Sequence, residues 1–129
     1  MTIQDHLNHA KRVAEHAHAP YSNFYVGCVV KTKAGNTYHG CNVENISYGL
    51  TICAERVAIG SAVAAEGSSM QLDHVYVAMA HEKEGSPCGA CRQVIAEFGA
   101  DAHVHFIQKG KVVSVSAADL LPYAFETLA

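Results

Sequence analysis

The sequence predicts one α/β domain spanning residues 1–129, a three-layer α/β/α sandwich with a mixed sheet of about five strands. Two observations lead to this prediction. Segments with apolar residues at helical spacing alternate with short apolar runs suited to buried strands, which favours a sheet covered by helices on both faces. The chain also has no repeat, low-complexity tract or Pro- or Ser-rich linker, and its length suits one ordinary domain.

The elements follow in order along the chain. Apolar residues at helical spacing from Leu7 to Ala17 predict a first helix, which Pro20 ends. Strands are expected at 25–30 and near 37–43, joined by a turn at 34–36. The remaining elements are a helix from Cys53 to about Gly67, a strand at 75–79, a helix from Cys88 to near Gly99, and strands at 104–107 and 112–115.

Composition and charge narrow the classes of function. Half of the residues are apolar, and the formal net charge is −3 with nine scattered Lys and Arg residues. Because polynucleotide affinity rests on many cationic contacts with phosphates, this balance disfavours a nucleic-acid partner and favours a small, nearly neutral substrate. No segment approaches the ~20 apolar residues of a membrane span, and residues 1–6 do not resemble a secretory signal. We therefore expect a cytoplasmic protein with reduced thiols and no membrane partner.

Three cysteines form the most informative pattern. Cys53 begins the motif Cys-Ala-Glu-Arg, and Pro87 directly precedes the pair Cys88 and Cys91. Three thiolates leave one position of a tetrahedral zinc ion open, which distinguishes a catalytic zinc from a structural one closed by four protein ligands. Both motifs fall at expected helix starts, where free N–H groups and helix dipoles stabilise surplus negative charge. The pattern predicts one catalytic Zn²⁺ per chain.

Two charged residues follow Cys53. Glu55 is close enough to exchange protons with a water molecule at the metal without being a ligand, as a general acid/base must be. Arg56 is placed to add a full positive charge beside the thiolates. These residues predict a hydrolytic enzyme in which Glu55 is the catalytic group.

Further segments resemble the small homotetrameric cytidine deaminases, and the similarity spans nearly the whole chain. They are Tyr21-Ser22-Asn23-Phe24, Val26-Gly27, Asn42-Val43-Glu44-Asn45, Ser47-Tyr48-Gly49-Leu50 and Leu120-Leu121-Pro122-Tyr123-Ala124-Phe125. The resemblance implies zinc-dependent hydrolytic deamination of free cytidine and 2′-deoxycytidine to the corresponding uridines, with release of ammonia, in pyrimidine salvage.

The resemblance also implies how the nucleoside is bound. Asn42 and Glu44 would bind the ribose 3′-hydroxyl, which suits a polar pair alternating on one strand face. The backbone around Ala54 and Ser86 would meet the edge of the base.

Three aromatic residues complete the expected substrate site. By the same resemblance, Phe24, Tyr48 and Phe125 would contact the nucleoside. The segments that carry Tyr48 and Phe125 resemble ones that reach neighbouring active sites, so a homotetramer is expected.

The other cysteines and the nine histidines are expected to have no chemical role. Cys28 and Cys41 lie in predicted strands without a partner motif, which favours core packing. No histidine has ligand spacing with the thiolates, and the pair His103 and His105 is typical of surface or strand positions.

Other classes of function stay open. A zinc-stabilised binding module would need a fourth ligand and a basic face, and neither is visible in the sequence. A thiol redox protein would use Cys88 and Cys91, but Pro87 and Glu55 have no role in that chemistry. Among deaminases, a polynucleotide editor or an antibiotic-nucleoside deaminase is an alternative to the free-nucleoside enzyme.

Overall fold

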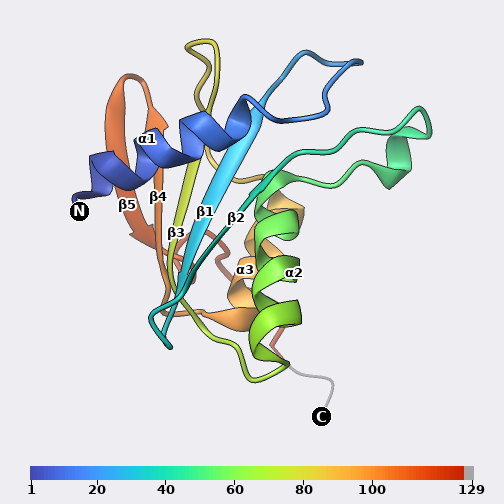
Figure 1. The fold of residues 1–129 in the computed structure, drawn as a ribbon. Coiled ribbons are helices and arrows are strands. Elements are labelled where there is room, and N and C mark those ends of the chain that lie inside the picture. The colour runs from blue at the N-terminus through green and yellow to red at the C-terminus, as the bar shows by residue number, and fades with distance from the viewer. Residues whose placement is uncertain (127–129) are drawn as a thin grey trace.

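The computed structural model describes residues 1–126 and contains a five-stranded mixed sheet with helices on both faces (Figure 1). The elements are α1 (Ile3–Ala14), β1 (Val26–Thr32), β2 (Thr37–Cys41), the 3₁₀ helix η1 (Tyr48–Leu50), α2 (Ala54–Glu66), β3 (Leu72–Met79), α3 (Gly89–Phe98), β4 (His103–Gln108) and β5 (Lys111–Ser116). The strand order is β2-β1-β3-β4-β5, with β3 and β4 parallel and the other neighbours antiparallel. The predicted three-layer sandwich is confirmed.

Two expected boundaries were wrong for local reasons. The first helix ends at Ala14 rather than near Ala17, because the N–H of Glu15 bonds to the carbonyls of Arg12 and Val13 and tightens the last turn. The second strand ends at Cys41 rather than at Val43. At the next residue, the side-chain oxygen of Asn42 accepts a hydrogen bond from the N–H of Val26 at 2.8 Å. A side chain thus replaces the backbone acceptor that a longer ladder would supply.

Helix α1 covers one face of the sheet, over β1 and β3 (Figure 1). Its start is fixed by a capping box, in which the Thr2 hydroxyl accepts from the N–H of Asp5 and the Asp5 carboxylate accepts from the N–H of Thr2. A Cβ at Gly27 would lie 1.9 Å from the carbonyl oxygen of Ala10, so only glycine allows α1 to approach β1 this closely.

Helices α2 and α3 cover the opposite face and enclose the larger core. A Cβ at Gly40 would lie 2.6 Å from the backbone nitrogen of Ala58, so this glycine brings β2 directly against α2. The core here is built mainly from valine and small residues, including Val30, Val75 and Val77. Because the two helices pack side by side on a rigid sheet, their N-termini are held in a fixed relation. Within residues 1–126, no helix is both long and apolar enough to span a bilayer.

Candidate active site

The three predicted ligand cysteines converge at the N-termini of α2 and α3. The sulfur atoms of Cys53, Cys88 and Cys91 all lie within 4.8 Å of one another, and those of Cys53 and Cys88 are 4.0 Å apart. Zn–S bonds of about 2.3 Å in tetrahedral geometry place two sulfurs roughly 3.8 Å apart, so this spacing fits one zinc ion.

The backbone explains why the thiols meet. Cys53 is the N-cap residue of α2, and Cys88 is the N-cap residue of α3. Each cap carbonyl accepts the first helical hydrogen bond, from Val57 and Arg92 respectively. Cys91 lies in the first turn of α3 and is buried. The prediction that both motifs begin helices is confirmed, and the positive ends of two helix dipoles face the sulfurs.

Arg56 lies against this cluster. Its Nη2 atom is 3.4 Å from the sulfur of Cys53. Hydrogen bonding with Cys91, together with Arg56, lowers the pKa of Cys53 to about 5. The pKa of Cys91 is raised by the same sharing of a proton with Cys53 and by burial. These surroundings therefore favour the thiolate form of Cys53, which is the form that binds a metal.

Glu55 is buried beside the thiols, with 4% of its surface exposed. Burial raises the pKa of its carboxyl group to about 7, and the negative charge of Cys53 acts in the same direction. A carboxyl group in this range can both accept and donate a proton near neutral pH, which is what a general acid/base requires.

A cavity of about 330 Å³ opens beside Glu55 and two of the three thiols. It brings together eight predicted site residues, namely Phe24, Asn42, Glu44, Cys53, Ala54, Glu55, Ser86 and Cys88. Its remaining lining residues were not predicted individually and are Ser22, Val26, Thr51 and Met79. The cavity is large enough for a small ligand with one charged end and one apolar wall.

Asn42 and Glu44 hold the loop that forms one wall of the cavity. The buried amide of Asn42 donates to the carbonyl of Phe24 at 2.8 Å and accepts from the N–H of Val26 at 2.8 Å. The Glu44 carboxylate accepts from the N–H groups of Tyr21 at 3.0 Å and Ser22 at 3.2 Å. Hydrogen bonding to Ser22 lowers the pKa of Glu44, so its carboxylate stays ionised.

Ser22 connects Glu44 with the backbone of Phe24. Its hydroxyl donates to the Glu44 carboxylate and accepts from the N–H of Phe24 at 3.0 Å. Asn23, between them, has a φ of 57°, the left-handed region that asparagine tolerates. The sequence did not predict this connection, because it depends on the turn at Asn23, although Ser22 is part of the segment Tyr21-Ser22-Asn23-Phe24.

Tyr48 and Phe125 lie away from this cavity in their own chain. Tyr48 is 73% exposed on the arm of residues 42–53, which projects from the molecule (Figure 1), and its ring meets that of Tyr21 edge-on at 5.7 Å. Phe125 is 70% exposed and lines a different cavity, beside α3.

Ser86 is tied to the second metal motif. Arg92 donates to the hydroxyl of Ser86 at 2.8 Å, to the carbonyl of Pro87 at 2.8 Å and to the carbonyl of Leu120 at 3.1 Å. Arg92 thereby fixes the loop that leads into Cys88, whereas Arg56 approaches the sulfurs directly.

The two remaining cysteines lie in the sheet. Cys28 is fully buried in the core on the α2 side, where burial raises the pKa of its thiol. Cys41 is half-buried at the end of β2, and all five thiols are free. The packing role expected for Cys28 agrees with its place in the core.

The metal motifs and the cavity can be compared with known proteins. The family model described as "Cytidine and deoxycytidylate deaminase zinc-binding region" matches residues 1–107. A cytidine deaminase from Sporosarcina psychrophila is 40% identical over 129 residues, which covers 97% of this chain and 92% of that protein. The chain belongs to the cytidine deaminase family.

Solved structures of the cytidine deaminase family agree with the fold. The crystal structure of a cytidine deaminase from Burkholderia pseudomallei superposes with a TM-score of 0.86 at 45% identity, covering 97% of this chain and 100% of that one. A more distant relative is a blasticidin-S deaminase from Bacillus cereus, 32% identical over 111 residues, which are 78% of this chain and 76% of that protein.

Zinc is the cofactor that both the cytidine deaminase family and the donor set indicate. The matched zinc-binding region contains Cys53, Cys88 and Cys91. Among residues 1–126 these are the one group of three ligand residues with all donor atoms this close. A cluster of three sulfurs, two of which line a cavity, favours a catalytic metal centre over a closed structural site or a dithiol pair.

Proposed function

We propose that this enzyme hydrolytically deaminates free cytidine and 2′-deoxycytidine to uridine and 2′-deoxyuridine in the cytoplasm, as part of pyrimidine salvage. One observation carries the proposal. One cavity is lined both by the carboxyl group of Glu55 with the thiols of Cys53 and Cys88, which we call its metal end, and by the ionised carboxylate of Glu44, which we call its sugar end. A nucleoside could present its base to the first group and its sugar hydroxyls to the second.

The chemistry at the metal end follows from the residues. Zinc, held by Cys53, Cys88 and Cys91, would supply a nucleophile at neutral pH by lowering the pKa of a water molecule. Glu55 would accept a proton from water and deliver it to N3 of the cytosine ring as the hydroxide oxygen adds to C4. Glu55 would then carry the proton of the new C4 hydroxyl to the amino group, so that the C4–N bond breaks, ammonia leaves and the C4 carbonyl of the uracil ring forms.

At the sugar end, Glu44 is an acceptor for a hydroxyl group. Its carboxylate has more acceptor positions than its contacts with Tyr21 and Ser22 use, and Asn42 keeps Phe24 at the cavity wall. Glu44 and Glu55 would both repel a phosphate group in this partly enclosed space. These charges support a free nucleoside rather than a nucleotide or a strand.

Apolar exposure supports the homotetramer expected from resemblance. The arm of residues 42–53 exposes large apolar side chains, including Ile46, Tyr48 and Leu50 at 80%, 73% and 65%. Contiguous apolar exposure of this kind is typical of a protein interface. Burial of this arm and of Phe125 against neighbouring subunits would bring Tyr48 and Phe125 to other active sites. Light scattering with the zinc-loaded protein should give four times the chain mass, and a monomeric mass would contradict this arrangement.

The test of the function compares substrates at equal concentration. We expect rapid loss of the cytosine absorbance with cytidine and deoxycytidine. Free cytosine should react poorly, because it lacks the sugar whose binding positions the base, and cytidine 3′-phosphate should react poorly because of Glu44. Blasticidin S and a short cytosine-containing strand serve as alternative substrates. Faster deamination of either one would overturn the free-nucleoside proposal.

A further inference from the structure

Three histidines meet on the face of the sheet that α1 covers only in part. In the parallel pairing of β3 and β4, His74 lies opposite His103 and Tyr76 lies opposite His105. Because side chains alternate along each strand, His74, His103 and His105 point to the same face. Ring centroids are 4.9 Å apart for His74 and His103, 5.3 Å for His74 and His105, and 6.5 Å for His103 and His105.

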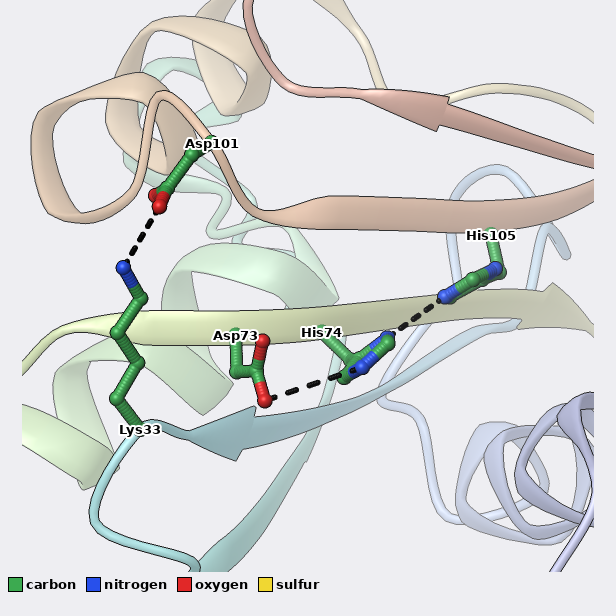
Figure 2. A network of polar contacts seen from close by, with 5 residues as sticks. All are labelled: Lys33, Asp73, His74, Asp101 and His105. Carbon is green, nitrogen blue, oxygen red and sulfur yellow. Dashed lines mark hydrogen bonds and ion pairs between the residues drawn. The ribbon is translucent and has the colours of Figure 1, made fainter.

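Two of these imidazoles point a nitrogen at each other. The Nδ1 atom of His74 is 3.0 Å from Nε2 of His105, as Figure 2 shows. Two lone pairs cannot face each other at this distance, so a proton or another cation must lie between the nitrogens. Two nitrogens on one tetrahedral zinc ion, each about 2.0–2.1 Å from it, would be roughly 3.3 Å apart, so the separation of the pair is close to that of two ligands, and small rotations of the rings would turn both nitrogens toward one ion.

The outer nitrogens of the pair face oxygen atoms. Nδ1 of His105 is 2.7 Å from the hydroxyl of Ser114, and Nε2 of His74 is 3.9 Å from the carboxylate of Asp73 (Figure 2). Histidines that bind metals typically hold their second N–H against such an oxygen, which leaves the inner nitrogen as the ligand. His105 therefore has the surroundings of a metal-binding histidine, while at His74 the Asp73 carboxylate contributes a nearby negative charge and no hydrogen bond.

His103 can supply a third nitrogen. It stacks on His74 and is exposed, so burial does not prevent its side chain from turning toward the pair. That rotation is necessary, because within residues 1–126 only the cysteine cluster already has three ligand atoms within 4.8 Å of one another. We propose that His74, His105 and His103 form a second metal site, separate from the thiols, for a divalent transition metal ion that favours imidazole, such as Ni²⁺, Cu²⁺ or Zn²⁺.

Burial and charge set the strength of this site. Burial lowers the pKa of His74 and lowers that of His105 to about 4, so both rings are neutral at pH 7, the form that binds metals. Asp73 favours a bound cation, whereas Lys31 on β1 opposes it. The His74 side chain is 31% exposed and gives a metal ion access to the buried His105.

Calorimetric titration of the tag-free, zinc-loaded protein with Ni²⁺ tests the site. We expect one Ni²⁺ to bind per chain without loss of zinc. Binding should be at least ~10-fold weaker in His74→Gln and in His103→Gln, the second of which changes an exposed side chain. Ser114→Ala keeps all three ligands and should also weaken binding by about 10-fold. His39→Gln is the matched control, because His39 is another exposed strand histidine whose ring lies 5.6 Å from that of a second histidine, His9.

Each outcome of the titration either supports or overturns the proposed histidine site. Loss of affinity in the His74 and His103 variants with unchanged binding in His39→Gln supports the site. No saturable binding below about 1 mM Ni²⁺, equal to a free energy of about −4 kcal/mol, would overturn it. Unchanged binding in His74→Gln, or loss in His39→Gln alone, would overturn it as well. Because the readout is Ni²⁺ binding and not turnover, the result is independent of the proposed deaminase activity.

Discussion

The side-chain amide of Asn42 donates to the carbonyl of Phe24 at 2.8 Å, and through this bond the end of β2 holds an aromatic wall of the cavity in place. The same amide accepts from the N–H of Val26 at 2.8 Å. Both ends of the buried amide are therefore engaged by the protein before any substrate arrives. The residue expected to contact the sugar also supports the site.

Asn42→Asp should destabilise the protein and lower its activity. The carboxylate can still accept from the N–H of Val26 but cannot donate to the carbonyl of Phe24, and an unpaired buried acceptor costs about 1–3 kcal/mol. Denaturant unfolding and steady-state kinetics measure the two effects. Asn45→Asp is the control, because Asn45 is exposed and its side chain only accepts, from the N–H of Ser47 at 2.9 Å. Equal stability of the two variants would contradict the role of Asn42.

Glu44→Ala should raise KM for cytidine and lower kcat/KM while zinc content stays unchanged, because the sugar hydroxyl loses its acceptor. Ser22→Ala should act in the same direction more weakly, since it removes the hydroxyl that connects Glu44 with the N–H of Phe24. Ser22→Thr keeps that hydroxyl and should retain most of the affinity. The proposed sugar contact is wrong if Glu44→Ala leaves KM unaltered.

Cys88→Ala should abolish zinc retention and activity together, because metal affinity depends on the complete set of ligands. Cys28→Ala is the control and should keep its zinc, since Cys28 is packed in the core away from the cluster of three thiols. Metal analysis of both purified variants measures the zinc content per chain. Full zinc in Cys88→Ala, or loss of zinc in Cys28→Ala, would mean that the wrong sulfurs have been assigned.

The stacked histidines should make the fold sensitive to acid. Burial lowers the pKa of His105 from 6.5 to about 4, so between these values the unfolded chain binds a proton that the native protein does not. Stability is therefore fully present above pH 6.5 and is lost as the pH falls toward 4, by an amount on the order of 3 kcal/mol. Unfolding measured at pH 7, 5 and 4 follows this loss, of which about 2 kcal/mol should appear by pH 5. His105→Gln should flatten the dependence relative to the wild type, and an equally steep loss in that variant would contradict the assignment.

Much of the metal end of the site could be predicted from the sequence, because short-range signals determine it. Cys53 and Cys88 are the N-cap residues of their helices, so their motifs predict both the chemistry and the position. Glu55 lies two residues after Cys53 in the first turn of the same helix, so its position needs no long-range information. The sheet also follows from local patterns, since alternating helices and valine-rich strands leave few arrangements.

The rest depends on how distant segments meet. The histidine pair was missed because it arises from the register of β3 against β4, although the alternation of His103 and His105 on one strand was a visible signal. The Ser22 link depends on a left-handed turn at Asn23. Tyr48 lies outside the cavity of its own chain, so its proposed role requires a neighbouring subunit that one sequence does not describe.

The central claim, that Glu55 moves protons for deamination at a three-cysteine zinc site, is tested most directly by the turnover of zinc-loaded Glu55→Gln. Gln keeps the size of the side chain but cannot carry protons, so zinc content and fold should match the wild type. Cytidine deamination, followed by ultraviolet absorbance, should fall by at least about 10²-fold, the lower range for general acid/base catalysis. Turnover above roughly a tenth of the wild-type rate would contradict the account.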